Sequence, residues 1–220
     1  MAHYEAVLFD LDGTLVDTRS ASWPLFARTN AEFALGIDTR EQFFAIFEGN
    51  FFESLTRHVG DEAKAAAAGR HFMELIREHY DPPFIDGIVE VVKALAATHT
   101  LAVVSSNMHS TILRLLRSGG IDQHFVTIYA GDTQPSKAAA IADFLCGGWA
   151  GETAPRQFDR AEVVLVTDTA GDVGEACASG IDAIGVAWGM HHQHQLMAAG
   201  AQQVASAPHE LLRWINRQST

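Results

Sequence analysis

Cysteine is scarce in this chain of 220 residues, which contains only Cys146 and Cys177. The two positions are far apart and form no Cys-x-x-Cys pair, so the sequence predicts free, buried thiols and argues against a disulfide or zinc framework. Free thiols are typical of a reducing compartment, and we therefore expect a cytoplasmic protein.

Long apolar stretches and positive charge are also scarce. No segment approaches the roughly 20 apolar residues that a membrane-spanning helix needs, and the N-terminal MAHYEAVLFD lacks the basic and apolar regions of a signal peptide. The chain has 15 Lys and Arg residues against 27 Asp and Glu residues, a net charge of -12. Because such a chain repels phosphate backbones at long range, we expect no nucleic acid as partner, and the lack of a long apolar segment predicts no membrane partner.

Hydrophobic residues make up 48% of the sequence, and five short apolar runs alternate with longer segments of helical periodicity. This alternation is typical of an α/β fold, and we predict a doubly wound, Rossmann-like parallel sheet with helices on both faces. The five runs are Ala6–Phe9, Leu101–Ser106, Val126–Gly131, Val163–Asp168 and Ala183–Trp188.

One connection in this pattern, residues 10–100, is far longer than a crossover helix requires. It contains successive amphipathic segments and no strand signal before the second apolar run. The helices expected in it cover residues 23–35, 40–59 and 61–80. We predict a helical cap domain over residues 17–84, inserted into a catalytic core of residues 1–16 and 85–220.

Two carboxylates, Asp10 and Asp12, end the first apolar run and are followed at once by a Gly-Thr pair. Side chains two residues apart project to the same side of an extended chain, so the two carboxylates can converge on one point. Because burying them unpaired is costly, this geometry suits a cation, a proton-transfer pair, or both. A plain Asp-Gly turn with two solvated acids is the alternative.

Polar residues also follow two later runs, where a parallel sheet gathers its functional groups. Ser105, Ser106 and Asn107 can hold the oxygens of an anion, although these residue types also end strands without any function. Asp168 ends the fourth run, and Asp172 lies four residues later at a predicted helix start. The two suit a metal ligand and its support, or a helix N-cap and a first-turn acid.

Lys137 begins a predicted helix in the segment GDTQPSKAAAIADFL. The positive end of the helix dipole disfavours a cation at this position. An anion is therefore expected opposite its ammonium group.

Together these segments resemble the haloacid dehalogenase superfamily, specifically its phosphatase branch with a helical cap after the first strand, as in phosphoglycolate phosphatase-like proteins. DLDGT (residues 10–14) is similar to the first motif of the family, and VVSS (103–106) is similar to the second. Lys137 corresponds to the third motif and TDTAGD (167–172) to the fourth. Two details differ. Thr167 stands where the family usually has glycine, and no proline follows Lys137, with Pro135 lying upstream instead.

The resemblance implies that Asp10 attacks phosphorus to form an aspartyl phosphate, and that Asp12 serves as general acid and base. It implies Mg²⁺ as cofactor, held by Asp10, the main-chain carbonyl of Asp12, and Asp168. Lys137 would bridge Asp10 and the phosphate. The phosphate-binding residues implied are Ser105, Ser106, Leu11, Gly13 and Lys137, and the supporting residues are Asp172 and Asn107.

The function that the resemblance implies is Mg²⁺-dependent hydrolysis of a small phosphorylated metabolite, such as phosphoglycolate or a sugar phosphate, by a monomer or homodimer. A phosphomutase similar to β-phosphoglucomutase uses the same phosphoaspartate and stays open as an alternative. So does a non-catalytic binding module that kept the fold. A dehalogenase is disfavoured because that branch generally lacks an acid at the position of Asp12.

The segment MHHQHQ contains three histidines, His191, His192 and His194. No carboxylate or cysteine lies beside them at ligand spacing, so we interpret them as a solvated helix start and not as metal ligands. Candidates for reading a second polar group of the substrate are the cap-region cations Arg19, Arg28, Arg57, His58 and Lys64.

Overall fold

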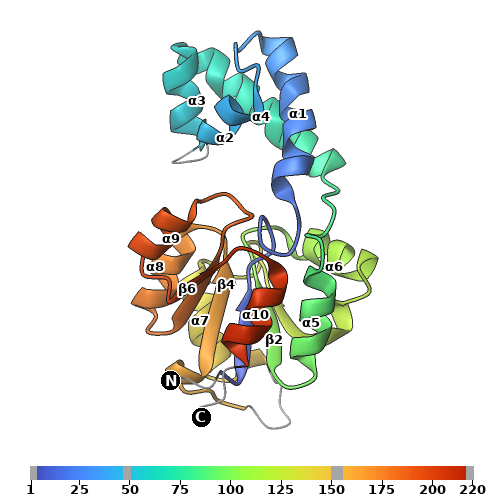
Figure 1. The fold of residues 1–220 in the computed structure, drawn as a ribbon. Helices are drawn as coiled ribbons and strands as arrows, with labels where there is room; N and C mark the ends of the chain where they lie inside the picture. The colour runs from blue at the N-terminus through green and yellow to red at the C-terminus, as the bar shows by residue number, and fades with distance from the viewer. Residues whose placement is uncertain (1–3, 47–50, 150–155, 217–220) are drawn as a thin grey trace. The chain divides into compact units, whose positions relative to one another are not determined.

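The computed structural model describes residues 4–46, 51–149 and 156–216. The chain divides into two compact units (Figure 1). The sheet unit consists of Met1–Val16 and Phe84–Thr220, and the helical unit consists of Asp17–Pro83.

The sheet unit is built on six parallel strands in the order β3-β2-β1-β4-β5-β6 (Figure 1). The strands are β1 (Ala6–Phe9), β2 (Thr100–Val104), β3 (Phe125–Tyr129), β4 (Val163–Thr167), β5 (Asp182–Val186) and β6 (Gln203–Ala205). The prediction of a doubly wound parallel sheet is confirmed. β6 was not predicted, because it has three residues and begins with an exposed glutamine.

The central strands are buried on both faces, which explains their continuous apolar sequences. All four residues of β1 and all five of β4 are buried. Phe9 of β1 pairs with Val103 of β2 on one side and with Val166 of β4 on the other. Because these partners are level with one another, the residues that follow the three strands emerge at one edge of the sheet.

Helices cover the sheet on both faces. α7, α8 and α9 contribute Phe144, Val173 and Leu196 to a buried cluster with Leu8 and Leu165 of the central strands. α5 and α10 pack against each other and lie in front of the sheet in Figure 1. The helices of this unit are α5 (Ile88–Ala96), α6 (His109–Ser118), α7 (Lys137–Leu145), α8 (Ala170–Ala178), α9 (Gln193–Ala198) and α10 (Pro208–Ile215).

The helical unit has its own apolar core. Phe26 of α1 stacks on Phe43 of α2 with ring centroids 4.4 Å apart, and Phe72 of α4 meets both rings edge-on. The helices are α1 (Thr18–Phe33), α2 (Arg40–Ala45), α3 (Phe51–Val59) and α4 (Glu62–His79).

Two helix boundaries in this unit differ from the sequence prediction. α1 begins at Thr18 and not at residue 23, because the Asp17 carboxylate accepts from the main-chain N–H of Ser20 and caps the helix. The single helix expected over 40–59 is two helices, α2 and α3, and residues 47–50 between them lie outside the described part of the chain.

The cysteines are free, as expected, but both are exposed and not buried. Cys146 follows the last residue of α7, and Cys177 lies on α8 with its Sγ 3.6 Å from the Gly200 carbonyl. A position at the end or on the outward side of a surface helix leaves the thiol accessible.

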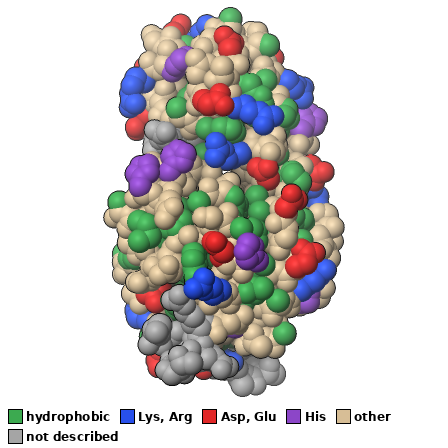
Figure 2. Space-filling model, viewed as in Figure 1, with side chains coloured by type: hydrophobic (Ala, Val, Ile, Leu, Met, Phe, Trp, Pro, Cys, Tyr) green, Lys and Arg blue, Asp and Glu red, His purple; other side chains and the backbone are tan. Residues whose placement is uncertain are grey.

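On the face in view, Figure 2 shows acidic and basic side chains of the described residues interspersed with one another. The acidic side chains of the described residues do not gather into one patch on this face. None of the described helices is both long and apolar enough to cross a membrane.

Replacing Phe26 by alanine should lower the free energy of unfolding of the helical unit by about 3–5 kcal/mol, because a fully buried stacked ring leaves a cavity. Urea denaturation followed by circular dichroism measures the change. Met73→Ala on α4 is the matched control: its side chain is 47% exposed, and the cost should stay within about 0.5 kcal/mol. Equal losses in the two variants would contradict the assigned core.

Candidate active site

The predicted site residues lie at one edge of the sheet unit, where the parallel strands end. Asp10 directly follows β1, Ser105 directly follows β2, and Asp168 directly follows β4. Lys137 is the first residue of α7, and Asp172 lies in the first turn of α8. Residues far apart in the sequence thus come together because parallel strands end at the same edge.

Local capping fixes the start of α7 and with it the position of Lys137. The Ser136 side chain accepts from the N–H of Ala139, and the Glu175 carboxylate of α8 accepts from the N–H of Ala138. These bonds satisfy two main-chain donors that a helix leaves free at its beginning. The side chain of Lys137 is therefore held against α8 and the end of β1.

The Lys137 ammonium lies between two carboxylates. Its Nζ is 2.8 Å from Oδ1 of Asp10 and 2.6 Å from Oδ2 of Asp172. Only 10% of the Lys137 side chain is exposed. Burial alone would lower the pKa of Lys137, but the two carboxylates outweigh it and raise the pKa above its ordinary value. Two carboxylates thus lie opposite this ammonium group, where the sequence predicted an anion.

Asp10 is buried in an excess of negative charge. Burial is the largest cause that raises its pKa well above the ordinary value, and the carboxylates of Asp172 and Asp168 add to it, whereas Lys137 opposes it. One ammonium therefore does not balance this group of carboxylates. A second positive charge would stabilise the ionised form of Asp10.

Asp168 offers a place for such a charge. Its Oδ2 accepts from the main-chain N–H of Met190 at 2.7 Å, whereas its Oδ1 is buried and has no hydrogen-bond partner among the described residues. Burial raises the pKa of Asp168 to about 7, although the bond from Met190 acts in the opposite direction. A buried carboxylate oxygen without a partner costs about 1–3 kcal/mol or more, and it is a ligand that Mg²⁺ prefers.

The donor set around Asp168 is small. Among the described residues, no three His, Cys, Asp or Glu side chains are grouped so that they could hold a metal ion. The set expected from the sequence needs only two carboxylates, those of Asp10 and Asp168, together with the main-chain carbonyl of Asp12. Such a set would leave the remaining positions around a cation to water, an arrangement that Mg²⁺ usually keeps.

Gly13 permits the close approach of the first loop to Asp168. A Cβ at this position would lie 2.0 Å from Oδ2 of Asp168, and the φ angle of +77° is rarely adopted by residues with a side chain. Its amide donates to the carbonyl of Val16 at 2.9 Å. We therefore assign the Gly13 amide to the turn and not to phosphate binding. The Leu11 side chain is fully buried, and its carbonyl accepts from the amides that close the same turn.

Asn107 connects the ends of β1 and β2. Its Nδ2 donates to Oδ2 of Asp12 at 3.3 Å, and its main-chain N–H donates to Oγ of Ser105 at 3.1 Å. Ser106 is exposed and lines a cavity of about 230 Å³ together with Ser105 and Lys137. These hydroxyl and ammonium groups can all donate to the oxygens of an anion in that cavity.

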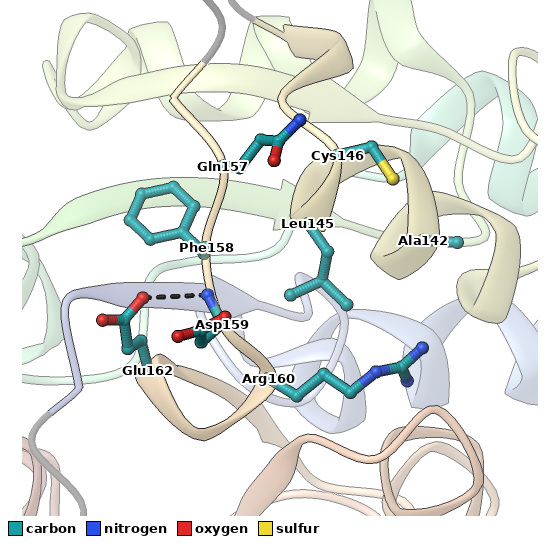
Figure 3. A pocket seen from close by; sticks show the side chains of 8 residues that line it. All are labelled: Ala142, Leu145, Cys146, Gln157, Phe158, Asp159, Arg160 and Glu162. Carbon is teal, nitrogen blue, oxygen red and sulfur yellow. Dashed lines mark hydrogen bonds between the residues drawn. The ribbon is translucent and has the colours of Figure 1, made fainter.

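A larger cavity, of about 650 Å³, lies at the opposite end of the sheet (Figure 3). Its walls come from the C-terminal half of α7 and from the segment that leads into β4. The lining residues are Ala142, Leu145, Cys146, Gln157, Phe158, Asp159, Arg160 and Glu162. None of them is a predicted site residue. The smaller cavity is lined by Ser105, Ser106 and Lys137, and it adjoins Asp10 through the contact of that carboxylate with Lys137.

Thr167 occupies the position where the sequence departs from the family pattern. Its side chain is buried, and its Oγ1 donates to Oδ2 of Asp172 at 2.8 Å. That oxygen is also the one that accepts from Lys137. The additional hydroxyl therefore joins the carboxylate network and does not disturb the approach of Asp172 to Lys137.

The segment Trp188–His191, which follows β5, was not predicted to contribute to the site, and His191 was expected only as part of a solvated helix start. Instead, Nδ1 of His191 accepts from the main-chain N–H of Ala170 at 2.8 Å. Trp188 Nε1 donates to the carbonyl of Thr14 at 3.1 Å, and the main-chain N–H of Met190 donates to the Asp168 carboxylate. The only feature that could have pointed to this segment is its position after β5. β5 is next to β4, so its carboxyl end reaches the same edge of the sheet as Asp168.

Comparison with known proteins agrees with this geometry. Residues 7–186 match the family model described as haloacid dehalogenase-like hydrolase. The chain is 31% identical over 224 residues to Probable phosphatase IndB of Dickeya dadantii, with 94% of each chain covered. It is 29% identical over 208 residues to a 5'-nucleotidase of Pseudomonas aeruginosa, covering 89% of this chain and 88% of that one.

A solved structure shares the fold. A haloacid dehalogenase-like family hydrolase from Streptococcus pneumoniae superposes with a TM-score of 0.77 at 24% identity, over 97% of this chain and 99% of that one. The chain belongs to the haloacid dehalogenase-like hydrolase family. The predicted family and the predicted class of enzyme, a phosphoric monoester hydrolase, are confirmed.

Removing the Thr167 hydroxyl should weaken catalysis through Asp172 and Lys137. Thr167→Val keeps the shape but removes the donor, and we expect a loss of about 10-fold or more in kcat/KM for an aryl phosphate, because a hydrogen bond to a charged group contributes about 1.5–3 kcal/mol. Thr167→Ser is the matched control and should retain most activity. A valine variant as active as the serine variant would show that the hydroxyl has no role.

Proposed function

We propose that the chain is a Mg²⁺-dependent phosphatase that hydrolyses a small phosphomonoester through an aspartyl phosphate on Asp10. The observation that carries this proposal is the buried contact between Lys137 and Asp10, with the partnerless Oδ1 of Asp168 in the same group of carboxylates. A phosphatase needs a nucleophile, a cation to offset the charge of the phosphate, and a proton donor. The described site contains residues suited to all three.

Asp10 is the proposed nucleophile. An oxygen of its carboxylate attacks phosphorus, and the bond from phosphorus to the ester oxygen breaks. The repulsion between two unit negative charges is about 4 kcal/mol at 4 Å and an effective dielectric constant near 20, so the attack needs positive charge nearby. Lys137 provides one such charge at Oδ1 of Asp10.

Asp10 and Asp168, with the main-chain carbonyl of Asp12, are the proposed holders of Mg²⁺, which when bound supplies further positive charge beside the phosphate oxygens. Asp172 does not belong to this set in our proposal. Its carboxylate is shared between Thr167 and Lys137, which suits a supporting role.

Asp12 is the proposed general acid and base. It gives a proton to the leaving oxygen, then takes one from the water that attacks the phosphoenzyme. The bond between phosphorus and Asp10 breaks in that second step, which releases inorganic phosphate and restores the carboxylate. Asn107 donates to Oδ2 of Asp12 and can fix the orientation of this carboxylate during both transfers.

Phosphate binding is proposed for Ser105, Ser106 and Lys137, which line the same cavity, and for the main-chain amide of Leu11. The cavity of about 230 Å³ suits a phosphoryl group better than a large substrate. The rest of the substrate would then be recognised elsewhere, which supports a role for the helical unit.

The helical unit, residues 17–84 in the sequence prediction, is the proposed cap domain that selects the substrate. Two of its candidate cations have contacts within the unit: Arg19 stacks over the ring of Phe44 at 4.2 Å, and the Lys64 ammonium donates to the Ala34 carbonyl at 3.1 Å. We propose a small phosphorylated metabolite as substrate and the cytoplasm as location.

Metal removal tests the proposed cofactor. The protein should hydrolyse 4-nitrophenyl phosphate in the presence of Mg²⁺, lose this activity in excess EDTA, and recover it when Mg²⁺ exceeds the chelator. Release of inorganic phosphate from a sugar phosphate, without formation of an isomeric sugar phosphate, separates a phosphatase from a phosphomutase. Unchanged turnover in EDTA would contradict the assigned metal.

Amide variants of the two aspartates should fail in different ways. Asp10→Asn should reduce activity to background for every substrate, because the attacking carboxylate is lost. Asp12→Asn should form a persistent phosphoenzyme with an aryl phosphate, whose leaving group hardly needs a proton, but not with an alkyl phosphate. Rapid quench with intact-protein mass spectrometry measures the added phosphoryl group.

The phosphoryl group should map to Asp10 in the Asp12→Asn variant and be missing from the Asp10→Asn variant. A label on a serine or histidine would contradict both assignments. Equal losses with aryl and alkyl substrates would contradict only the acid and base role of Asp12.

A further inference from the structure

The segment Trp188–His191 packs closely on Asp168. At Gly189, an added Cβ would lie 2.1 Å from Cβ of Asp168, so only glycine allows this approach without a shift. The next amide, that of Met190, donates to Oδ2 of Asp168 at 2.7 Å. One oxygen of this carboxylate is therefore occupied by a main-chain donor, and the other is buried and has no hydrogen bond from any residue that the structure describes.

His191 fixes this segment by two bonds, one to Asp168 and one to the start of α8. Its main-chain N–H donates to the carbonyl of Asp168 at 3.2 Å, and its Nδ1 accepts from the N–H of Ala170 at 2.8 Å. Ala170 is the first residue of α8, whose N–H has no acceptor within the helix itself. These contacts form a closed loop: Asp168 leads into α8, the first residue of α8 donates to the imidazole, and the main chain of His191 donates back to Asp168.

The other end of the segment is held as well. Trp188 Nε1 donates to the carbonyl of Thr14, in the turn that follows Asp12. The amide of Met190 therefore lies between two anchors, one at Trp188 and one at His191. Because the Met190 amide is fixed at both sides, its position determines which oxygen of Asp168 accepts its hydrogen bond.

We infer that His191 is a positioning residue for the cation-binding carboxylate of Asp168. By accepting from Ala170, it holds the Met190 amide on Oδ2 and leaves Oδ1 as the oxygen that can reach a divalent cation. This inference rests on the proposed function, because it takes Asp168 as a ligand of Mg²⁺. His191 itself contacts neither substrate nor cation in this account.

The two neighbouring histidines offer a matched contrast. His192 is the N-cap residue of α9, where its main-chain N–H donates to Oε1 of Gln195 at 2.9 Å, and its ring stacks on that of His194 with centroids 6.0 Å apart. Both therefore act on α9, whereas His191 acts on α8. Substitution of His192 should leave Asp168 unchanged.

Calorimetric titration of the full chain with Mg²⁺ alone tests the inference without substrate. His191→Leu keeps a bulky side chain but removes the acceptor, and its Kd for Mg²⁺ should rise by about 10-fold or more, as for other groups that orient a metal ligand. His191→Asn places a carbonyl oxygen near the position of Nδ1 and should stay within about threefold of the unsubstituted protein. His192→Ala should have the original Kd.

Activity gives a second readout. At saturating Mg²⁺, the kcat of His191→Leu for 4-nitrophenyl phosphate should approach that of the unsubstituted protein, because only cation affinity is lost. A thermal melt checks that each variant is folded, and His191→Ala serves in place of the leucine variant if the latter does not fold.

Two results would overturn the inference alone: an unchanged Kd for the variants without an acceptor, or an asparagine variant as weak as the leucine variant. A different result would overturn the metal assignment of the proposed function and the inference with it. That result is Mg²⁺ binding to Asp168→Asn as tight as to the unsubstituted protein, or no binding to the latter at all.

Discussion

The arrangement of this site depends on one interaction, the contact of the buried Lys137 ammonium with the carboxylates of Asp10 and Asp172. Charges buried in a protein interior are costly unless they are paired, and removing one partner of such a pair typically costs about 3–5 kcal/mol. Here one cation faces several carboxylates, so the pairing is incomplete. A group of carboxylates that is not fully paired favours the binding of a further cation, which is the role that the proposed function gives to Mg²⁺.

Much of the fold could be predicted from the sequence because its signals are local. Strands buried on both faces must be apolar throughout, so β1, β2 and β4 were readable as short apolar runs. β6 could not be recognised, since three residues at the sheet edge leave no such run. The early start of α1 depended on one capping contact by Asp17, and a hydrophobic pattern does not report a cap.

The site was predictable where it depends on side-chain chemistry and strand order. Asp10 was expected at the carboxyl edge of the sheet because it follows a strand, whereas the contact of Lys137 with Asp10, 127 positions away, was implied only by the resemblance to the family. The Gly13 amide was expected to face phosphate, but it donates to Val16 within the turn. Main-chain donors such as those of Gly13 and Met190 have no residue signature, so their direction emerges only from the folded loop.

Hydrogen bonding by neutral groups explains how position 167, usually glycine in the family, can hold threonine without loss of the site. With glycine at position 167, Asp172 would accept from Lys137 and have no hydroxyl beside it; with Thr167, a neutral donor shares the same oxygen. A hydroxyl adds no charge, so it does not alter the imbalance between the carboxylates and Lys137. The Met190 amide acts on Asp168 in a comparable way, since it is also a neutral donor that occupies one carboxylate oxygen. A neutral donor therefore adjusts the direction of a carboxylate and its strength as an acceptor without changing the charge of the site, whereas a change at a charged residue alters the chemistry itself.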